Sequence, residues 1–332
     1  MRKITLIERL KKISSEDSPS FPYDIRKLLS GKITSVKSQI LQSSRLIYED
    51  ENLDETLRFK AYYLHMVMLW RLKEFESFRL NLDTNFNRFE SHKLFNAFRA
   101  QYFLSQENTQ YNLESAIYYA KLCAKELGKF PSVLHLHALT IVNYAEDIKE
   151  HDIKKLRLAE SQVNKAIALS KGEYAGHYAL SARVKLLLGK FTESYKDLRN
   201  AIEKEPSNNN EYPIRIGEYH EIKSRISNAE YIDFVKKQQE KAMTLFSNLR
   251  VQMIQLLGIL SAVIIFMVST VQIAQNIENI RKAALLIFIG GLVSVMVFAL
   301  FSLVFIEGKV KAKSIILSLF CIIAIILAIN FL

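Results

Sequence analysis

Glycine and proline are scarce in this chain of 332 residues, which has ten and five of them respectively. Between about residues 35 and 226, proline occurs only at Pro131, Pro206 and Pro213. No segment there shows a sustained alternation of apolar and polar residues flanked by turns, which is the pattern of a strand. Because these two residue types interrupt helices and form turns, their scarcity indicates long helices. The sequence therefore predicts an all-α fold and leaves little room for glycine-rich phosphate loops.

Cysteine is also rare, with only Cys123 and Cys321, which excludes a disulfide framework and fits a reducing compartment. The seven histidines form no metal-binding motif, since His135 and His137 are two residues apart on an expected helix and point in different directions. Acidic residues at 49–51 and 54–55 are interpreted as a solvated helix start. We predict no catalytic residue, no cofactor and no metal site; an enzyme hidden in residues 1–95 is the alternative.

Charge is missing from three long runs at the end of the chain, residues 251–274, 283–306 and 314–332. A bilayer core about 30 Å thick needs about 20 helical residues, so each run is long enough to span it. Lipid offers no partner for backbone polar groups, which favours helices. We predict a three-span transmembrane domain over 251–332; the alternative is three helices buried in a soluble core. Without ionisable groups, the spans favour an anchor or an oligomeric pore over a coupled transporter.

Basic residues beside the spans predict their orientation. Seven flank what would be the inner side, and two lie in the first loop on the other side. The inner residues are Lys236, Lys237, Lys241, Arg250, Lys309, Lys311 and Lys313, and the outer ones are Arg281 and Lys282. Residues 1–13 contain no continuous apolar core that would direct export. The positive-inside rule thus predicts a cytoplasmic N-terminal domain and an external C-terminus, in a membrane that we take to be a bacterial inner membrane.

The formal net charge of +11 divides into +3 in residues 251–332 and +8 in the rest. This moderate excess fits a position near an anionic leaflet, and nucleic acid is not predicted as a partner. Residues 1–34 are expected to form an amphipathic helix and a loop. That helix either caps the helical domain that follows or lies on the membrane.

Residues 35–226 are expected to form a helical-repeat domain, clearest over 95–208. Residues 175–208 read AGHYALSARVKLLLGKFTESYKDLRNAIEKEPSN. Large and small residues alternate at fixed positions of two helices, at Tyr178, Ala182, Gly189, Phe191, Ser194, Leu198, Ala201 and Pro206. This pattern resembles a tetratricopeptide repeat, with Ser194 in place of an alanine and Lys185 in place of an aromatic residue.

Two weaker copies of the small–large–small stripe precede it, at Ala116, Ala120 and Cys123 and at Ala159, Val163 and Ala166. The intervals between the stripes are 43 and 35 residues, which predicts an insertion near 146–155. The resemblance implies a superhelix of stacked helix pairs whose concave groove binds a protein or peptide, and no reaction.

Residues 227–250 are expected to form a connecting helix. Ser227 to Glu230 has the Ser-x-x-Glu form of a capping box, so a helix is expected to begin near Asn228 and to continue into the first span. A row in steps of four and three follows, which we call the seam: Val235, Gln239, Ala242, Phe246, Leu249 and Met253. The row continues at Leu256 and Leu260. It either packs on the chain's own spans or repeat domain, or forms a parallel stalk with other copies.

Small residues in the spans are candidates for close helix packing: Gly258, Ala262, Gly290, Gly291 and Ser294. Two functional hypotheses follow. The first is a membrane-anchored adaptor or sensor that binds a cytoplasmic protein or peptide without catalysis. The alternative is a membrane-perturbing effector, of the toxin or anti-phage type, whose repeat domain senses a trigger and whose spans oligomerise into a pore.

Overall fold

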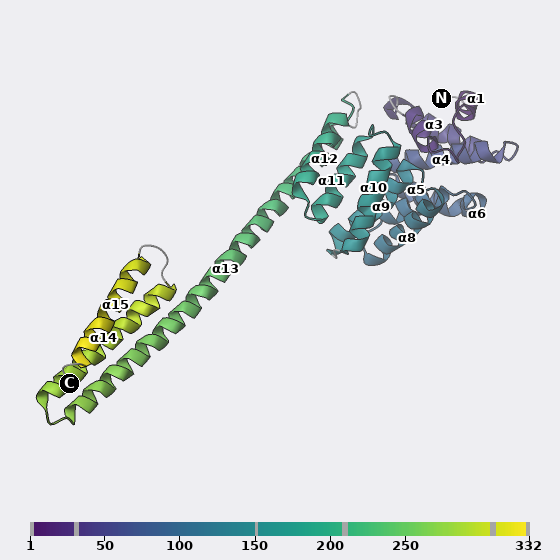
Figure 1. Cartoon of the computed structure of the whole chain (residues 1–332). Helices are drawn as coiled ribbons and strands as arrows, with labels where there is room; N and C mark the ends of the chain where they lie inside the picture. The colour runs from purple at the N-terminus through teal and green to yellow at the C-terminus, as the bar shows by residue number, and fades with distance from the viewer. Residues whose placement is uncertain (1–2, 30–32, 150–151, 208–211, 306–309, 330–332) are drawn as a thin grey trace. The chain divides into compact units, whose positions relative to one another are not determined.

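The computed structural model describes residues 3–29, 33–149, 152–207, 212–305 and 310–329. Every regular element within these ranges is a helix, as Figure 1 shows, so the all-α prediction is confirmed. The helices form two compact units, Met1–Asp233 and Phe234–Leu332. Each unit is described separately.

The first unit consists of twelve helices and the beginning of a thirteenth, within the described residues. They are α1 (Lys3–Lys11), α2 (Phe21–Leu29), α3 (Ile33–Tyr48), α4 (Glu55–Arg71), α5 (Phe75–Thr84), α6 (Phe86–Phe89), α7 (Phe95–Leu104), α8 (Gln110–Glu126), α9 (Pro131–Ile148), α10 (Ile153–Leu169), α11 (Ala175–Leu187), α12 (Phe191–Lys204) and α13 (Tyr212–Gln275).

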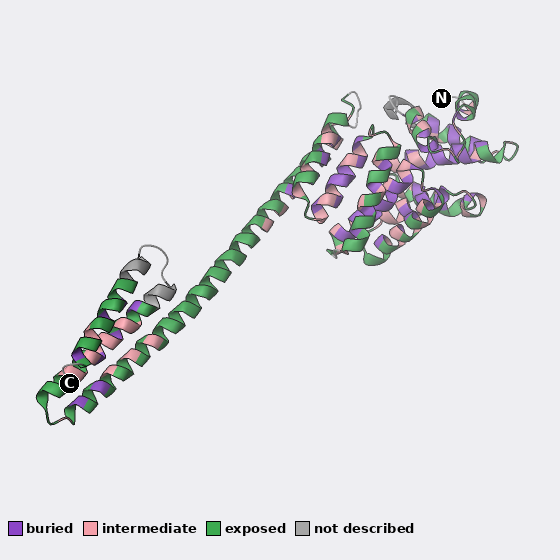
Figure 2. Ribbon diagram, viewed as in Figure 1, coloured by how far each residue is buried: buried purple, intermediate pink, exposed green. Residues whose placement is uncertain are grey.

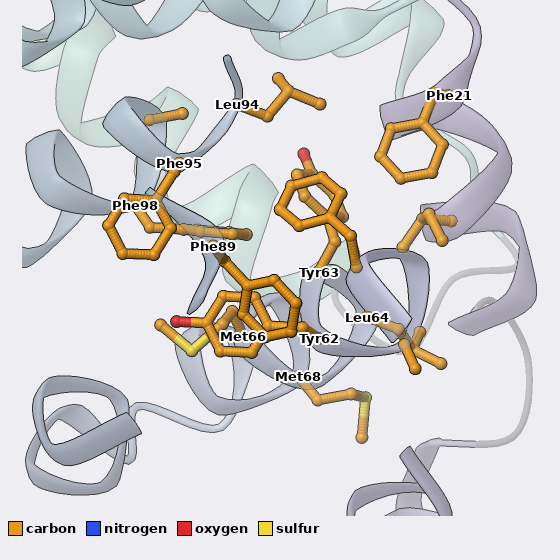
Figure 3. Close-up of a cluster of buried hydrophobic side chains, with 14 of the residues drawn as sticks. Phe21, Tyr62, Tyr63, Leu64, Met66, Met68, Phe89, Leu94, Phe95 and Phe98 are labelled. Carbon is orange, nitrogen blue, oxygen red and sulfur yellow. The ribbon is translucent and has the colours of Figure 1, made fainter. Parts of the chain in front are cut away.

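Aromatic side chains build the core of the N-terminal half of this unit (Figure 3). Tyr62 of α4 stacks on Phe89 with ring centroids 4.5 Å apart and meets Phe98 of α7 edge-on at 6.0 Å. Such pairs add about 0.5–1.5 kcal/mol each beyond the area they bury. The core also takes in Leu6 of α1 and Phe21 of α2, both fully buried. The N-terminal segment is therefore an integral part of the helical domain.

The interpretation of residues 1–34 as one helix and a loop is wrong in one respect, because residues 21–29 form a helix of their own, α2. Pro22 lies in its first turn, where the missing backbone N–H costs no hydrogen bond. Ile25 and Leu29 are buried one turn apart on its inner face. Burial of this face outweighs the turn signal that the two prolines of the segment give.

Helices α7 to α12 pack as three successive pairs, α7 with α8, α9 with α10 and α11 with α12. Neighbouring pairs meet through α8 with α9 and α10 with α11, and the odd-numbered helices α7, α9 and α11 also contact one another in turn. Figure 1 shows α9 to α12 side by side. In this half of the unit each helix thus packs between its predecessor and its successor.

The predicted insertion near 146–155 is replaced by a longer helix. Helix α9 has 18 residues against 13 in α11, and it ends at Ile148, shortly before α10 begins at Ile153. Residues 150 and 151 lie outside the described residues. The 43-residue interval between the first two stripes is therefore longer than the next one partly because α9 has at least one helical turn more than α11.

Helix α13 is a single helix of 64 residues that begins at Tyr212, with Pro213 in its first turn. The helix start predicted at Ser227–Glu230 is therefore wrong. Ile222 and Ile226 are buried against α11 and α12, in one cluster with Ala182 and Leu198. This packing holds α13 in helical form up to the capping sequence, which then lies within a continuous helix.

The second unit contains the remainder of α13 with α14 (Ile280–Phe305) and α15 (Val310–Ile329), and α14 packs against α15. By length and composition, α13 and α14 are apolar enough to cross a membrane. The apolar part of α15, Ile315–Ile329, is shorter. The last three residues of the predicted third span lie outside the described residues. Figure 2 shows exposed residues along the middle of α13.

Candidate binding site

A largely buried carboxylate links three consecutive odd-numbered helices. Glu146 near the end of α9 accepts two hydrogen bonds from Arg183 of α11, Nε to Oε1 at 3.1 Å and Nη2 to Oε2 at 2.7 Å. Arg225 of α13 approaches the same carboxylate with Nη2 2.8 Å from Oε1 and Nη1 3.2 Å from Oε2. Both arginines are thus bidentate, the strongest geometry for such pairs. We call Glu146, Arg183 and Arg225 the charge cluster.

A further hydrogen bond and partial burial hold the charge cluster in place. Arg183 also donates from Nη2 to Asn143 Oδ1 at 2.8 Å, one turn before Glu146 on α9. The side chains of Glu146 and Arg183 retain 13% and 20% of their exposure, and that of Arg225 retains 38%. Arg225 therefore forms the accessible edge of the cluster, and the other two residues form its interior.

The charge cluster carries a net positive charge at neutral pH. Burial alone would raise the pKa of Glu146, but the hydrogen bonds and charges of Arg183 and Arg225 outweigh burial and hold this pKa below its ordinary value. In the neighbouring Asp147, burial and the charge of Glu146 raise the pKa. Two guanidinium groups face one ionised carboxylate, so the site favours a carboxylate or another acceptor-rich polar group.

A second polar cluster lies between α11 and α12. Asp197, which is 8% exposed, accepts hydrogen bonds from Ser181 Oγ at 2.6 Å and from Lys185 Nζ at 2.7 Å. Lys185 occupies the position where the repeat pattern expects an aromatic residue. The ion pair gives a physical reason for this departure, because a buried lysine requires a charged partner.

Two histidines meet at the contact of α9 and α11. The Nδ1 atoms of His135 and His177 lie 3.0 Å apart, so one ring donates to the other. Burial and Arg26 lower the pKa of His177 to about 4, and burial and the charge of His177 hold the pKa of His135 well below its ordinary value. Both rings are neutral at pH 7. Within the described residues no group of three or more metal-ligating side chains is present.

Most of the residues predicted to pack within the repeat lie in or beside the contact of α11 and α12. Ser194, Leu198 and Ala201 of α12 are buried against Ala182 of α11, and Tyr178 and Phe191 pack on the edge of the same cluster. The stripes of α8 and α10 are also fully buried, at Ala116, Ala120, Cys123, Ala159, Val163 and Ala166. Pro206 is exposed just beyond the end of α12.

Two of these positions show why the residue type matters. Ser194 donates from Oγ to the carbonyl of Ala182 at 2.6 Å, which satisfies the hydroxyl where the pattern has alanine. Gly189 takes a φ of 72° as it closes α11, a left-handed conformation that favours glycine.

The seam residues are exposed along α13. Among the span residues, Gly290 and Ser294 are buried on α14, whereas Gly258 and Ala262 are exposed on α13. At 100° per residue, Gly258 lies on the opposite side of α13 from the row that continues the seam, so the two features cannot serve one interface.

One open depression in the N-terminal half, with a volume of about 460 Å³, has polar walls that include Tyr48 and Asn81. Its two arginines are already paired, Arg45 with Glu49 and Arg88 with Glu51. It thus offers no free charge for a ligand.

Sequence reasoning missed the charge cluster and the Asp197 cluster. The three residues of the charge cluster lie 37 and 42 positions apart and form no local motif. For Asp197 a signal was present, since Lys185 departs from the repeat pattern and therefore implies a nearby carboxylate.

Comparison of the chain with protein-family models, with curated proteins and with solved structures finds no match, so the tetratricopeptide-like resemblance stays a prediction from the residues themselves.

Proposed function

We propose that this protein is a membrane-anchored helical-repeat protein that binds a protein or peptide partner and catalyses no reaction. The cytoplasm is the compartment of the repeat domain, with α13, α14 and α15 as three spans and the C-terminus outside. The observation that carries the proposal is the charge cluster on three consecutive odd-numbered helices, in a chain whose α13 and α14 are apolar enough to cross a membrane.

The packing order supports a tetratricopeptide-like solenoid. In such repeats the first helix of each pair packs on its own second helix and also on the first helix of the next pair. Contacts of α9 with α10 and with α11 follow this order. The buried small side chains on α8, α10 and α12 allow close approach within each pair, as at Ala120, Ala159 and Ala201.

The groove of a solenoid is lined by the first helices of its pairs. Asn143, Glu146, Arg183 and Arg225 bridge α9, α11 and α13, which are these helices in the proposed phase. A bound polypeptide would present carbonyl or carboxylate oxygens to Arg225, the accessible guanidinium of the group. Guanidinium groups bind such oxygens through two parallel hydrogen bonds.

The test is partner capture by the full-length chain in detergent, comparing Arg225→Ala with Arg199→Ala. Arg199 lies on α12, and its side chain is 81% exposed, so its loss is the matched control away from the proposed groove. We expect Arg225→Ala to lose the captured protein at least tenfold while membrane fractionation stays unchanged and Arg199→Ala behaves as wild type. Equal capture by both variants, or capture of nothing by the wild-type chain, contradicts the proposal.

A second candidate function is a membrane-perturbing effector whose spans oligomerise. The observation that favours it is Gly291, next to the buried Gly290 on α14, which has no atom within 4 Å of its would-be Cβ. An open glycine in a candidate span leaves room for a helix of another copy. Induced expression should then depolarise cells, and Gly291→Leu should relieve this effect. An unchanged membrane potential on induction counts against the pore.

A further inference from the structure

The row of residues that begins with the seam changes surroundings along α13. Its continuation through Leu260 reaches Thr270 and Ala274, which are buried. A Cβ on Gly290 of α14 would lie 2.8 Å from Thr270 Cγ2, so the two helices are in close contact there. Near the lower end of the row, α14 of the same chain therefore contacts α13.

Helix α14 is too short to reach the seam. Two antiparallel helices rise equally per residue, so each step away from the Thr270–Gly290 contact advances both by about 1.5 Å. The last residue of α14, Phe305, lies fifteen residues beyond Gly290, which puts it opposite about Gln255 of α13. The whole seam precedes this point.

The seam residues are correspondingly exposed in the single chain. The exposed fraction is 43% for Val235, 72% for Phe246 and 54% for Leu249, the large apolar seam residues that precede the predicted span at 251–274. Hydrocarbon cannot cover most of this stretch, because Lys236, Glu240 and other charged residues are interspersed with it. A row of large apolar side chains outside the bilayer signals a protein interface.

We propose that a second copy of this chain covers the seam, in a parallel, in-register pair of α13 helices. This inference rests on the membrane anchoring proposed above. Two copies anchored by the same span have the same direction and put each seam residue at the same height above the bilayer.

The side chain of Gln239 favours a second copy of this chain as the partner. It is the one polar residue of the seam, and an amide both donates and accepts, so it is complementary to the same residue across a symmetric pair. In a parallel coiled coil, a single polar residue in the apolar row specifies register at some cost in stability. The positions that flank the seam fit as well, because Lys236 comes beside Tyr231 of the copy and Arg250 beside Leu245 of the copy, with no like charges in contact.

The test is disulfide cross-linking of the full-length chain in phosphatidylglycerol–phosphatidylethanolamine vesicles, after Cys123→Ala and Cys321→Ala. New cysteines are introduced on the seam, Leu249→Cys, and on the outer face of the same helix, Thr244→Cys. We expect Leu249→Cys to form a covalent dimer at least ten times faster than Thr244→Cys. Equal rates, or no dimer from either, overturn the proposal.

Register and polarity are tested in the same vesicles. Added to Leu249→Cys, the change Gln239→Glu puts two carboxylates opposite each other and should slow dimer formation at least fivefold at pH 7, whereas Gln239→Asn should retain it. No difference between the two overturns the role of Gln239. Carbonate extraction of the same samples reports anchoring separately: a membrane-bound chain without seam-specific dimers refutes self-association alone, and an extracted chain refutes the anchor.

Discussion

Replacing Glu146 by glutamine should destabilise the first unit, Met1–Asp233, more than replacing either of its arginine partners. The substitution keeps the shape of the side chain but removes the negative charge between Arg183 and Arg225. The two guanidinium groups then lose the charged carboxylate that they share, and the amide nitrogen that replaces one of its oxygens donates and cannot accept their hydrogen bonds. The loss therefore includes both the hydrogen bonds and an uncompensated buried charge.

The structure gives the order of the effects. Breaking a buried ion pair by removing one partner costs about 3–5 kcal/mol. Glu146 is 13% exposed, so we expect about 3 kcal/mol for Glu146→Gln. Arg183→Gln removes the bonds to Glu146 and Asn143 but leaves Arg225 to neutralise the carboxylate, and should cost about 2 kcal/mol. Arg225 is 38% exposed, and solvent screening reduces the cost of Arg225→Gln to about 1 kcal/mol.

Urea unfolding of the full-length chain in detergent measures these differences. The single tryptophan, Trp70 of α4, packs against Phe75 and Phe78 and reports on the N-terminal half by fluorescence. Far-ultraviolet circular dichroism follows all helices, so a separate transition of the paired helices α7 to α12 would also be seen. Arg199→Gln, on the exposed surface of α12, is the control and should change the unfolding midpoint little.

A double-mutant cycle decides whether the charge cluster acts as a unit. Once Glu146 is neutral, removing Arg225 relieves repulsion, so Glu146→Gln with Arg225→Gln should be more stable than Glu146→Gln alone. The coupling should be at least about 0.5 kcal/mol. A loss below about 0.5 kcal/mol for Glu146→Gln, or strict additivity, refutes the reasoning and makes the cluster a solvated surface pair.

The remaining predictions concern pH, the span contact and the repeat stripe. Burial lowers the pKa of His65 and His177 to about 4, so these histidines take up protons below about pH 6.5 in the unfolded chain but not in the folded chain. The free energy of unfolding should therefore be unchanged above pH 6.5 and fall by up to about 3 kcal/mol per histidine between pH 6.5 and 4. Urea midpoints measured at pH 7 and pH 5 test this fall. Gly290→Leu should disrupt the contact of α13 and α14 and lower the thermal stability in detergent, whereas Gly291→Leu should not. Equal effects of the two changes would count against a close approach at Gly290. Ser194→Ala should change the free energy of unfolding by no more than about 1 kcal/mol, whereas Ser194→Leu should overpack the contact of α11 and α12 and cost about 1–3 kcal/mol. Chemical denaturation measures both; an unchanged midpoint for Ser194→Leu would show that this contact is loosely packed.

Much of the local structure could be predicted from sequence because it depends on neighbours along the chain. The absence of strand periodicity and the scarcity of glycine indicate helices, and the small residues at Ala159, Val163 and Ala166 indicate which helix face is buried. Where prediction of boundaries was wrong, at α2 and at the start of α13, tertiary burial of Ile25 and Ile222 outweighed local turn and capping signals.

By itself, the sequence determined that this chain is helical, that its end is apolar and that α13 carries a regular apolar row, since each of these is a property of residue type and spacing. Only the tertiary structure decided that Glu146, Arg183 and Arg225 meet and that α14 contacts α13 near Thr270 but ends before the seam. The physical reason is that contacts between helices depend on helix lengths and on residues distant in sequence. The periodicity of a sequence shows only which face of a single helix is apolar.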